Sequence, residues 1–149
     1  MKKLAILLVV VAAVSCRQQV VVPPSQVDTR AGAPTPRGAL TRFMTAAKNQ
    51  DLQEMSNIWG SSAGPARSTM DQQTLEQREF ILMGCLKHDS YRVLSEAPAM
   101  VNERMLSVEL KHKDLTRSSN FYVTRGPEDR WYVRTLDLEP LRDICVRKT

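Results

Sequence analysis

Histidine and cysteine are the side chains of this sequence best suited to bind a metal ion or to act in catalysis. His88 and His112 are the only histidines, and Cys85 and Cys145 are the cysteines outside the N-terminal region. Zinc ligands usually come in close pairs such as C-x-x-C or H-x-x-x-H. No such pair occurs here, so we predict no metal site and no cofactor. His88 follows an expected helix, whose dipole favours a histidine there, and His112 lies between two lysines at an expected strand end, where a solvated role is predicted.

A second pattern suggests a nucleophilic serine. Gly60-Ser61-Ser62-Ala63-Gly64 matches G-x-S-x-G, which in α/β-hydrolases places the serine on a sharp turn between a strand and a helix. Here a helical pattern precedes the run, and the remaining residues cannot supply the parallel sheet that such hydrolases need. We therefore interpret the run as a stretch of small side chains within a loop that is predicted over residues 60–68.

The basic net charge raises the question of a nucleic-acid partner. The chain has 149 residues, which fits one domain, and a formal charge of +5. Most of the excess lies in the first 37 residues, because the other 112 carry sixteen Lys and Arg against fifteen Asp and Glu. A domain that neutralises many phosphates shows a basic stripe instead. No nucleic-acid partner is predicted.

Residues 1–15 have the organisation of a secretory signal peptide. Lys2 and Lys3 provide the positive start, and eleven apolar residues follow from Leu4 to Val14. At about 1.5 Å per helical residue this run is too short to cross a hydrocarbon core of about 30 Å. The segment is expected to direct export.

The end of this segment, Ala13-Val14-Ser15-Cys16, resembles the lipobox of bacterial lipoproteins. The resemblance implies cleavage before Cys16, fatty acylation of its sulfur and of the new amine, and stable anchoring by several acyl chains such as palmitate. Because residue 17 is Arg rather than Asp, the resemblance implies the outer membrane, facing the periplasm. A secreted or periplasmic soluble protein is the alternative.

The residues after Cys16 are expected to form a tether. Residues 16–36 hold four of the eight prolines of the chain and show no sustained apolar period. Proline removes backbone donors and favours extended segments, so a semi-flexible linker is predicted. The single folded domain is expected over residues 37–149.

With Cys16 assigned to lipid, Cys85 and Cys145 remain as an even pair in an oxidising compartment. A disulfide across this separation stabilises a protein by roughly 4 kcal/mol in the chain-entropy description. It requires Cα atoms within about 7 Å. Two unpaired buried thiols are the alternative.

The domain begins with a helical pattern. Thr35-Pro36 is a typical helix start, and a first helix is predicted over about 36–48. Asp51, with Glu54 three residues later, predicts a short second helix that ends before Gly60. A third helix is predicted from about residue 71 to residue 87.

From residue 90 the apolar period changes to two, which is typical of strands. Strands are predicted over about 91–95, 105–113, 119–125 and 130–138, and a last short helix over 141–146. Three helices followed by a run of antiparallel strands predict an α+β domain, with the helices covering one face of a curved sheet.

This order of elements resembles the cone-shaped nuclear-transport-factor-2-like family. The resemblance rests on the opening helix, with Leu40, Phe43, Met44 and Ala47, and on the late hairpin through Gly126 to Trp131-Tyr132-Val133. It implies a pocket between the sheet and the three helices, which members use for catalysis, ligand binding or protein contact.

A non-enzymatic binding module is the function that we predict. Its partner would be a small apolar ligand or an envelope protein, and a homodimer is left open. The expected pocket walls are apolar side chains: Phe43, Leu82, Leu106, Val108 and Val133. A pocket filled by Trp59 and Trp131 would leave a purely structural role.

The alternative is an isomerase, cyclase or hydrolase with a carboxylate in the cavity. Ketosteroid isomerase, a member of the same family, uses a carboxylate base together with a tyrosine and a protonated aspartate. The nearest analogues here are Asp137 and Tyr122, although no motif places them at equivalent positions. The competing interpretation is that Tyr122 packs in the sheet and that Asp137 pairs with an arginine such as Arg134 or Arg142.

Overall fold

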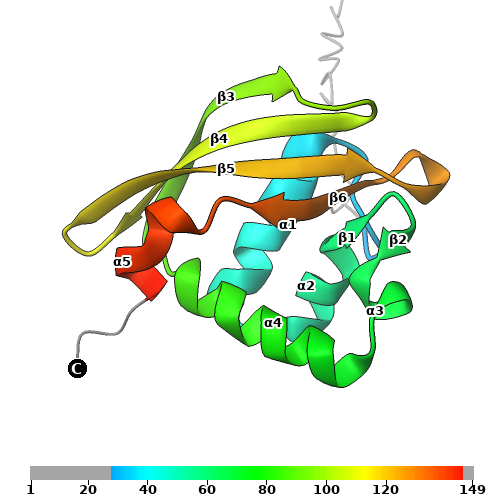
Figure 1. Cartoon of the computed structure of the whole chain (residues 1–149), viewed down its shortest axis with the longest axis horizontal. Coiled ribbons are helices and arrows are strands. Elements are labelled where there is room, and N and C mark those ends of the chain that lie inside the picture. The colour runs from blue at the N-terminus through cyan, green and yellow to red at the C-terminus, as the bar shows by residue number, and fades with distance from the viewer. Residues whose placement is uncertain (1–27, 146–149) are drawn as a thin grey trace, which may run out of the picture.

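The computed structural model describes residues 28–145. They form an α+β structure, as predicted for the class, with helices on one side of a four-stranded sheet (Figure 1). No helix in this part of the chain is long and apolar enough to cross a membrane. The expected signal peptide, Cys16 and the first part of the expected tether lie outside the described residues.

Local capping explains where the three longest helices begin. α1 (Pro36–Asn49) begins after Thr35, whose hydroxyl accepts a hydrogen bond from the Gly38 N–H at 3.0 Å. α2 (Leu52–Ile58) begins after Asp51, whose carboxylate accepts a hydrogen bond from the Glu54 N–H. α4 (Gln72–Cys85) begins after Asp71, whose carboxylate accepts one from the Thr74 N–H. These caps satisfy N–H groups that have no partner within the helix.

The predicted arrangement, three N-terminal helices on one curved sheet as in the nuclear-transport-factor-2-like cone, is wrong. The described residues form five α-helices and two antiparallel sheets rather than three N-terminal helices on a single sheet. Residues 60–68, expected to be a loop, contribute β1 (Gly60–Ser61), β2 (Gly64–Pro65) and most of α3 (Ala66–Thr69). Elements this short show no periodic pattern, so the sequence does not reveal them.

The larger sheet is an antiparallel meander in sequence order. Its strands are β3 (Ser90–Pro98), β4 (Glu103–His112), β5 (Leu115–Arg125) and β6 (Trp131–Leu136). The 3₁₀-helix η1 (Pro127–Asp129) forms the expected turn between β5 and β6. A second 3₁₀-helix, η2 (Glu139–Leu141), and α5 (Arg142–Cys145) follow the sheet.

One face of this sheet packs against the helices and forms the core. Successive residues on a strand point to opposite faces, which brings alternate apolar side chains together with those of α1. These buried residues include Leu40, Phe43, Met44, Leu106, Val108, Phe121, Val123 and Val133.

The last residues of the expected tether belong to this folded body. Arg130, only 4% exposed, donates from Nε to the carbonyl of Ala31 at 3.1 Å and from Nη2 to that of Gly32 at 2.6 Å. The same Nη2 contacts the Asp28 carboxylate at 2.6 Å, and Ala33 bridges to the outer edge of β6. Ordered packing therefore begins before residue 37, because a buried guanidinium holds this segment against β6.

Candidate functional site

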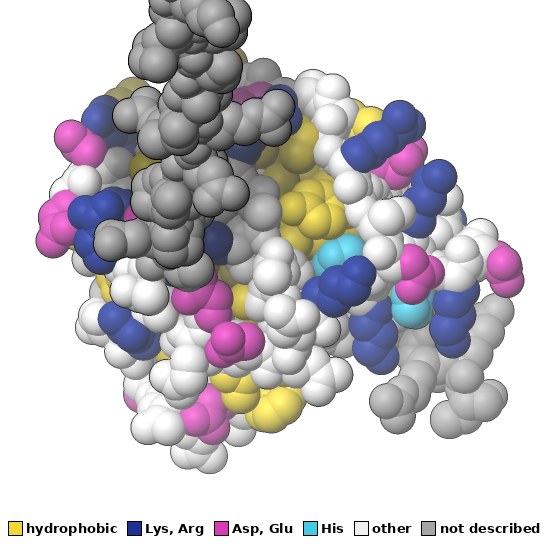
Figure 2. All heavy atoms as spheres, turned by 180° about the vertical axis from the view of Figure 1, so that it is seen from behind, with side chains coloured by type: hydrophobic (Ala, Val, Ile, Leu, Met, Phe, Trp, Pro, Cys, Tyr) yellow, Lys and Arg dark blue, Asp and Glu magenta, His cyan; other side chains and the backbone are white. Residues whose placement is uncertain are grey.

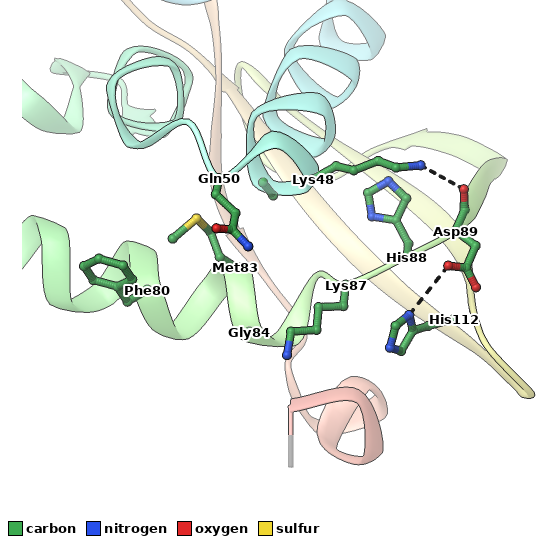
Figure 3. Close-up of a pocket in the computed structure, with 10 residues that line it drawn as sticks. Lys48, Gln50, Phe80, Met83, Gly84, Lys87, His88, Asp89 and His112 are labelled. Carbon is green, nitrogen blue, oxygen red and sulfur yellow. Dashed lines mark hydrogen bonds and ion pairs between the residues drawn. The ribbon is translucent and has the colours of Figure 1, made fainter. Parts of the chain in front are cut away.

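A cleft of about 410 Å³ lies where the C-terminal ends of α1 and α4 meet the beginning of β3 and the end of β4 (Figure 3). We call it the histidine cleft, because both histidines of the chain line it. It is lined by Ala47, Lys48, Gln50, Phe80, Met83, Gly84, Lys87, His88, Asp89 and His112. None of the side chains expected to wall a pocket lines this cleft.

His88 is buried in the wall of this cleft and is 7% exposed. Its Nδ1 lies 2.7 Å from the carbonyl oxygen of Leu86, the C-cap residue of α4. Because a carbonyl can only accept, Nδ1 carries the proton, and Nε2 of the neutral ring is left as an acceptor. Burial lowers the pKa of His88 below its usual range and favours that neutral ring.

Asp89 holds the backbone at the rim of the cleft. Its Oδ2 accepts a hydrogen bond from the Lys113 N–H at 2.7 Å, and its carbonyl oxygen accepts one from Lys48 Nζ at 3.0 Å. Its Oδ1 lies 4.0 Å from Nδ1 of His112, too far for a hydrogen bond. The His112 Nδ1 is buried and has no hydrogen-bond partner among residues 28–145.

Apolar and cationic side chains share the cleft. Figure 3 shows Phe80 and Met83 of α4 on one side and the two histidines on the other, with Lys87 between them. Figure 2 shows the histidines on the face opposite to that of Figure 1, with Lys or Arg side chains around them and a hydrophobic patch beside one of them. The cleft therefore offers an apolar surface next to cationic and neutral polar nitrogens.

Local backbone features position these groups. α1 ends at Gln50, which adopts the left-handed conformation (φ 57°) and donates its N–H to the carbonyls of the last turn. The disulfide between Cys85 and Cys145, predicted from the sequence and present in the structure, joins the end of α4 to α5. It anchors the segment that contributes Gly84, Lys87 and His88 to the lining of the cleft.

The side chains expected to wall a pocket lie elsewhere. Phe43, Leu106, Val108 and Val133 are fully buried in the core, and Leu82 is nearly so. Trp59 and Trp131 pack against the same cluster. These residues fill the space between helices and sheet, and the cleft opens beyond them.

The candidate catalytic pair lies on the outer face of the sheet. Tyr122 is adjacent to the inward Phe121, so it points outward, where the Arg134 guanidinium lies 5.9 Å from its ring centroid. Asp137 accepts a hydrogen bond from the Asn120 amide at 3.0 Å. Neither residue lines the histidine cleft.

The arginines proposed to pair with Asp137 bind other carboxylates. Arg134 forms two hydrogen bonds with Glu103, at 2.6 and 3.1 Å, and Arg142 binds Glu139 at 2.5 Å. The expected pairing with Asp137 is therefore not the one the structure shows.

The structure also bears on the G-x-S-x-G run and on metal binding. In Gly60–Gly64, the Ser61 Oγ accepts a hydrogen bond from the Ala63 N–H within a two-stranded hairpin, so no strand-to-helix nucleophile turn exists there. Within residues 28–145 no group of three or more His, Cys, Asp or Glu side chains is placed to hold a metal ion.

The sequence predicts separate surroundings for the two histidines, a helix end for His88 and a solvated strand end for His112. The hydrogen bond to Leu86 agrees with the first interpretation. That both line one cleft depends on how the end of β4 is paired with the start of β3. The only signal in the sequence was that the chain has two histidines in all.

Comparison with protein-family models and with curated proteins finds no match to this chain.

Proposed function

We propose that this chain is a binding module whose histidine cleft takes a small ligand with one acidic group and one apolar part. The observation that carries the proposal is the joint lining of one cleft by Lys48, Lys87 and both histidines beside Phe80 and Met83. Ligand sites commonly combine apolar walls with a few polar groups that orient the ligand.

The charges of the cleft favour an anion. Two lysines line it against one carboxylate, Asp89, and that carboxylate already accepts the Lys113 N–H. An incoming carboxylate or phosphate would therefore meet donors and a positive potential.

Binding fits the geometry better than catalysis does. A general acid or base works through a hydrogen bond of about 2.6–3.2 Å to the group that it serves. The Asp89 carboxylate and His112 Nδ1 are 4.0 Å apart, and the proton on His88 Nδ1 is held by a backbone carbonyl. No pair of these groups is placed to transfer a proton, whereas the ammonium groups of Lys48 and Lys87 can attract an anion.

The location that we propose is the cell envelope, with a lipid anchor on Cys16 and an outer-membrane position facing the periplasm. The lipobox-like residues support the anchor. The disulfide supports an oxidising compartment, because such bonds are rare in reducing cytosol.

The two histidines allow a direct test. We would titrate the full-length chain with octanoate at constant ionic strength and follow the imidazole signals by NMR, since each signal reports on this cleft alone. Octanol and octylammonium serve as neutral and cationic controls. We expect saturable shifts of both imidazoles with octanoate and much smaller shifts with either control.

Matched lysine variants sharpen the result. Lys87→Met should weaken octanoate binding at least about threefold, because it removes a charge from the cleft. Lys111→Met, which removes an exposed charge outside the lining, should leave binding nearly unchanged. Equal shifts with octanol, or equal losses in the two variants, would overturn the proposal.

A further inference from the structure

Helix α4 turns a carboxylate inward and two large apolar side chains outward. Glu79 is 1% exposed, whereas Phe80 and Ile81 are 60% and 61% exposed. The Oε1 atom of Glu79 is buried and accepts no hydrogen bond from residues 28–145. An unpaired carboxylate in such a place is unfavourable, and buried acids in proteins are normally paired or neutralised.

This carboxylate borders a second cleft, of about 240 Å³, between α2 and α4. We call it the α2–α4 cleft, and it shares no lining residue with the histidine cleft. It is lined by Leu52, Gln53, Ser56, Arg67, Gln72, Leu75, Glu76 and Glu79.

Two carboxylates on one turn of α4 set the electrostatics of this cleft. Burial, and secondarily the negative charge of Glu76, raise the pKa of Glu79 to about 7. Glu76 itself accepts a hydrogen bond from the Gln72 amide at 2.8 Å. A cation beside Glu79 would favour its ionised form and supply the missing hydrogen bond.

We propose that the α2–α4 cleft binds a primary ammonium group, which donates to the buried Oε1 of Glu79 and is attracted by Glu76. The apolar side chains of Leu52 and Leu75 border the same space and suit a short alkyl stem. An ammonium offers three donors on a compact charge, which matches a site that presents acceptors. This site is independent of the anion site proposed above.

Arg67 is the other charged residue that lines the cleft, and its side chain is exposed. Its charge opposes a second cation, so its removal should strengthen ammonium binding. If Arg67 instead swings inward to serve as the partner of Glu79, ammonium binding should be absent until Arg67 is removed.

The test uses the full-length chain with its glutamate side-chain carboxyls labelled with ¹³C, and n-butylammonium as the probe. Because the cation binds ionised Glu79, saturating butylammonium should lower the pKa of Glu79 by at least one unit. Affinity should fall about tenfold per pH unit below pH 7, since protonation then competes with binding. Tetramethylammonium, which has the charge but no N–H donor, and butanol should produce neither effect.

Variants separate the site from a general charge effect. Glu79→Gln resembles the protonated form, so it should fold, and it should weaken butylammonium binding at least tenfold. Glu76→Gln should weaken binding less, and Glu128→Gln, on the exposed turn before β6, should not change it. A free small amine and the side chain of a lysine residue both present a primary ammonium group. A parallel titration with Nα-acetyl-lysine amide, which represents the lysine residue, distinguishes these two sources from each other.

Three outcomes would overturn the proposal. One is an unchanged pKa of Glu79 in saturating butylammonium. Another is an equal response to tetramethylammonium. The third is loss of binding in Arg67→Gln, which would show that Arg67, rather than the carboxylates, holds the probe.

Discussion

Cys145 is bonded to Cys85, and their Cα atoms lie 4.0 Å apart. Each is the last residue of its helix, so the bond joins the C-terminal ends of α4 and α5. Cys85 directly follows Gly84 and lies three residues before His88, and both Gly84 and His88 line the histidine cleft. The covalent framework of the domain and its candidate binding site therefore share one segment of chain.

Loss of this disulfide should weaken both the fold and the cleft. The double variant Cys85→Ser/Cys145→Ser is expected to lower the free energy of unfolding by about 2–4 kcal/mol, because the unfolded chain regains conformational freedom. Urea denaturation of this variant and of the unmodified chain measures the difference. Octanoate binding should weaken in parallel, and an unchanged denaturation midpoint would contradict the prediction.

His88 should make the fold sensitive to acid. Its pKa is lowered in the folded state, chiefly by burial, so the unfolded chain binds a proton more readily. Stability should therefore decrease as pH falls below about 6.5, the value expected in the unfolded chain. His88→Asn, which keeps an N–H donor but does not titrate in this range, should flatten the decrease. Thermal unfolding between pH 5 and 8 measures it, with His112→Asn as the control.

Glu79 should act in the opposite direction. Its folded-state pKa is about 7, above the 4.5 of an unburied glutamate, so the folded chain binds the proton more readily. Stability from this group should decrease as pH rises from about 4.5 to 7, with a slope of at most about 1.4 kcal/mol per pH unit. Glu79→Gln should remove this slope. The two effects overlap, so each is read as the difference between a variant and the unmodified chain.

Arg130 should control the order of residues 28–33. Arg130→Met removes the donors to the carbonyls of Ala31 and Gly32, although the Gly32 carbonyl keeps its hydrogen bond from Arg42 Nη1. The amide of Ala33, which donates to the Trp131 carbonyl, should then exchange with solvent about tenfold faster. Arg125→Met removes an exposed ion pair with Asp129 and should leave the exchange rate unchanged.

The lipid anchor can be tested in cells. Cys16→Ser should abolish incorporation of labelled palmitate and release the chain from the membrane fraction or leave it unprocessed, because the acylated sulfur is gone. The unmodified chain should be labelled and sediment with membranes. Labelling that survives the substitution would show that lipid is attached elsewhere or that the cysteine has no such role.

Local patterns in the sequence were enough for several elements. Thr35 and Asp51 cap helices where predicted, because an N-cap bond joins residues only two or three apart. The alternation in Met105 to Lys113 predicted β4, since strand geometry sends alternate side chains to opposite faces. The disulfide followed from an even pair of cysteines.

The number of elements did not follow from local patterns. β1, β2 and α3 are too short to show a periodic pattern. They are stabilised by the pairing of β1 with β2 and by contacts with α2 and β6. A loop and such a hairpin look alike in sequence. The prediction of three N-terminal helices on a single sheet was wrong because it did not include this hairpin and α3.

The candidate sites depend on residues far apart in the chain, and no spacing rule relates them. Lys48 and His112 line one cleft because helix packing and strand register bring the C-terminal ends of α1 and β4 to it. Glu79 is buried although Phe80 and Ile81 beside it are exposed, which reverses the apolar pattern from which burial is predicted. Tyr122 and Asp137 point away from the core because each directly follows a residue that points inward. These inward residues, Phe121 and Leu136, are paired across β5 and β6. Local chemistry acts over a few residues, whereas a cleft is the space that remains after distant elements have packed.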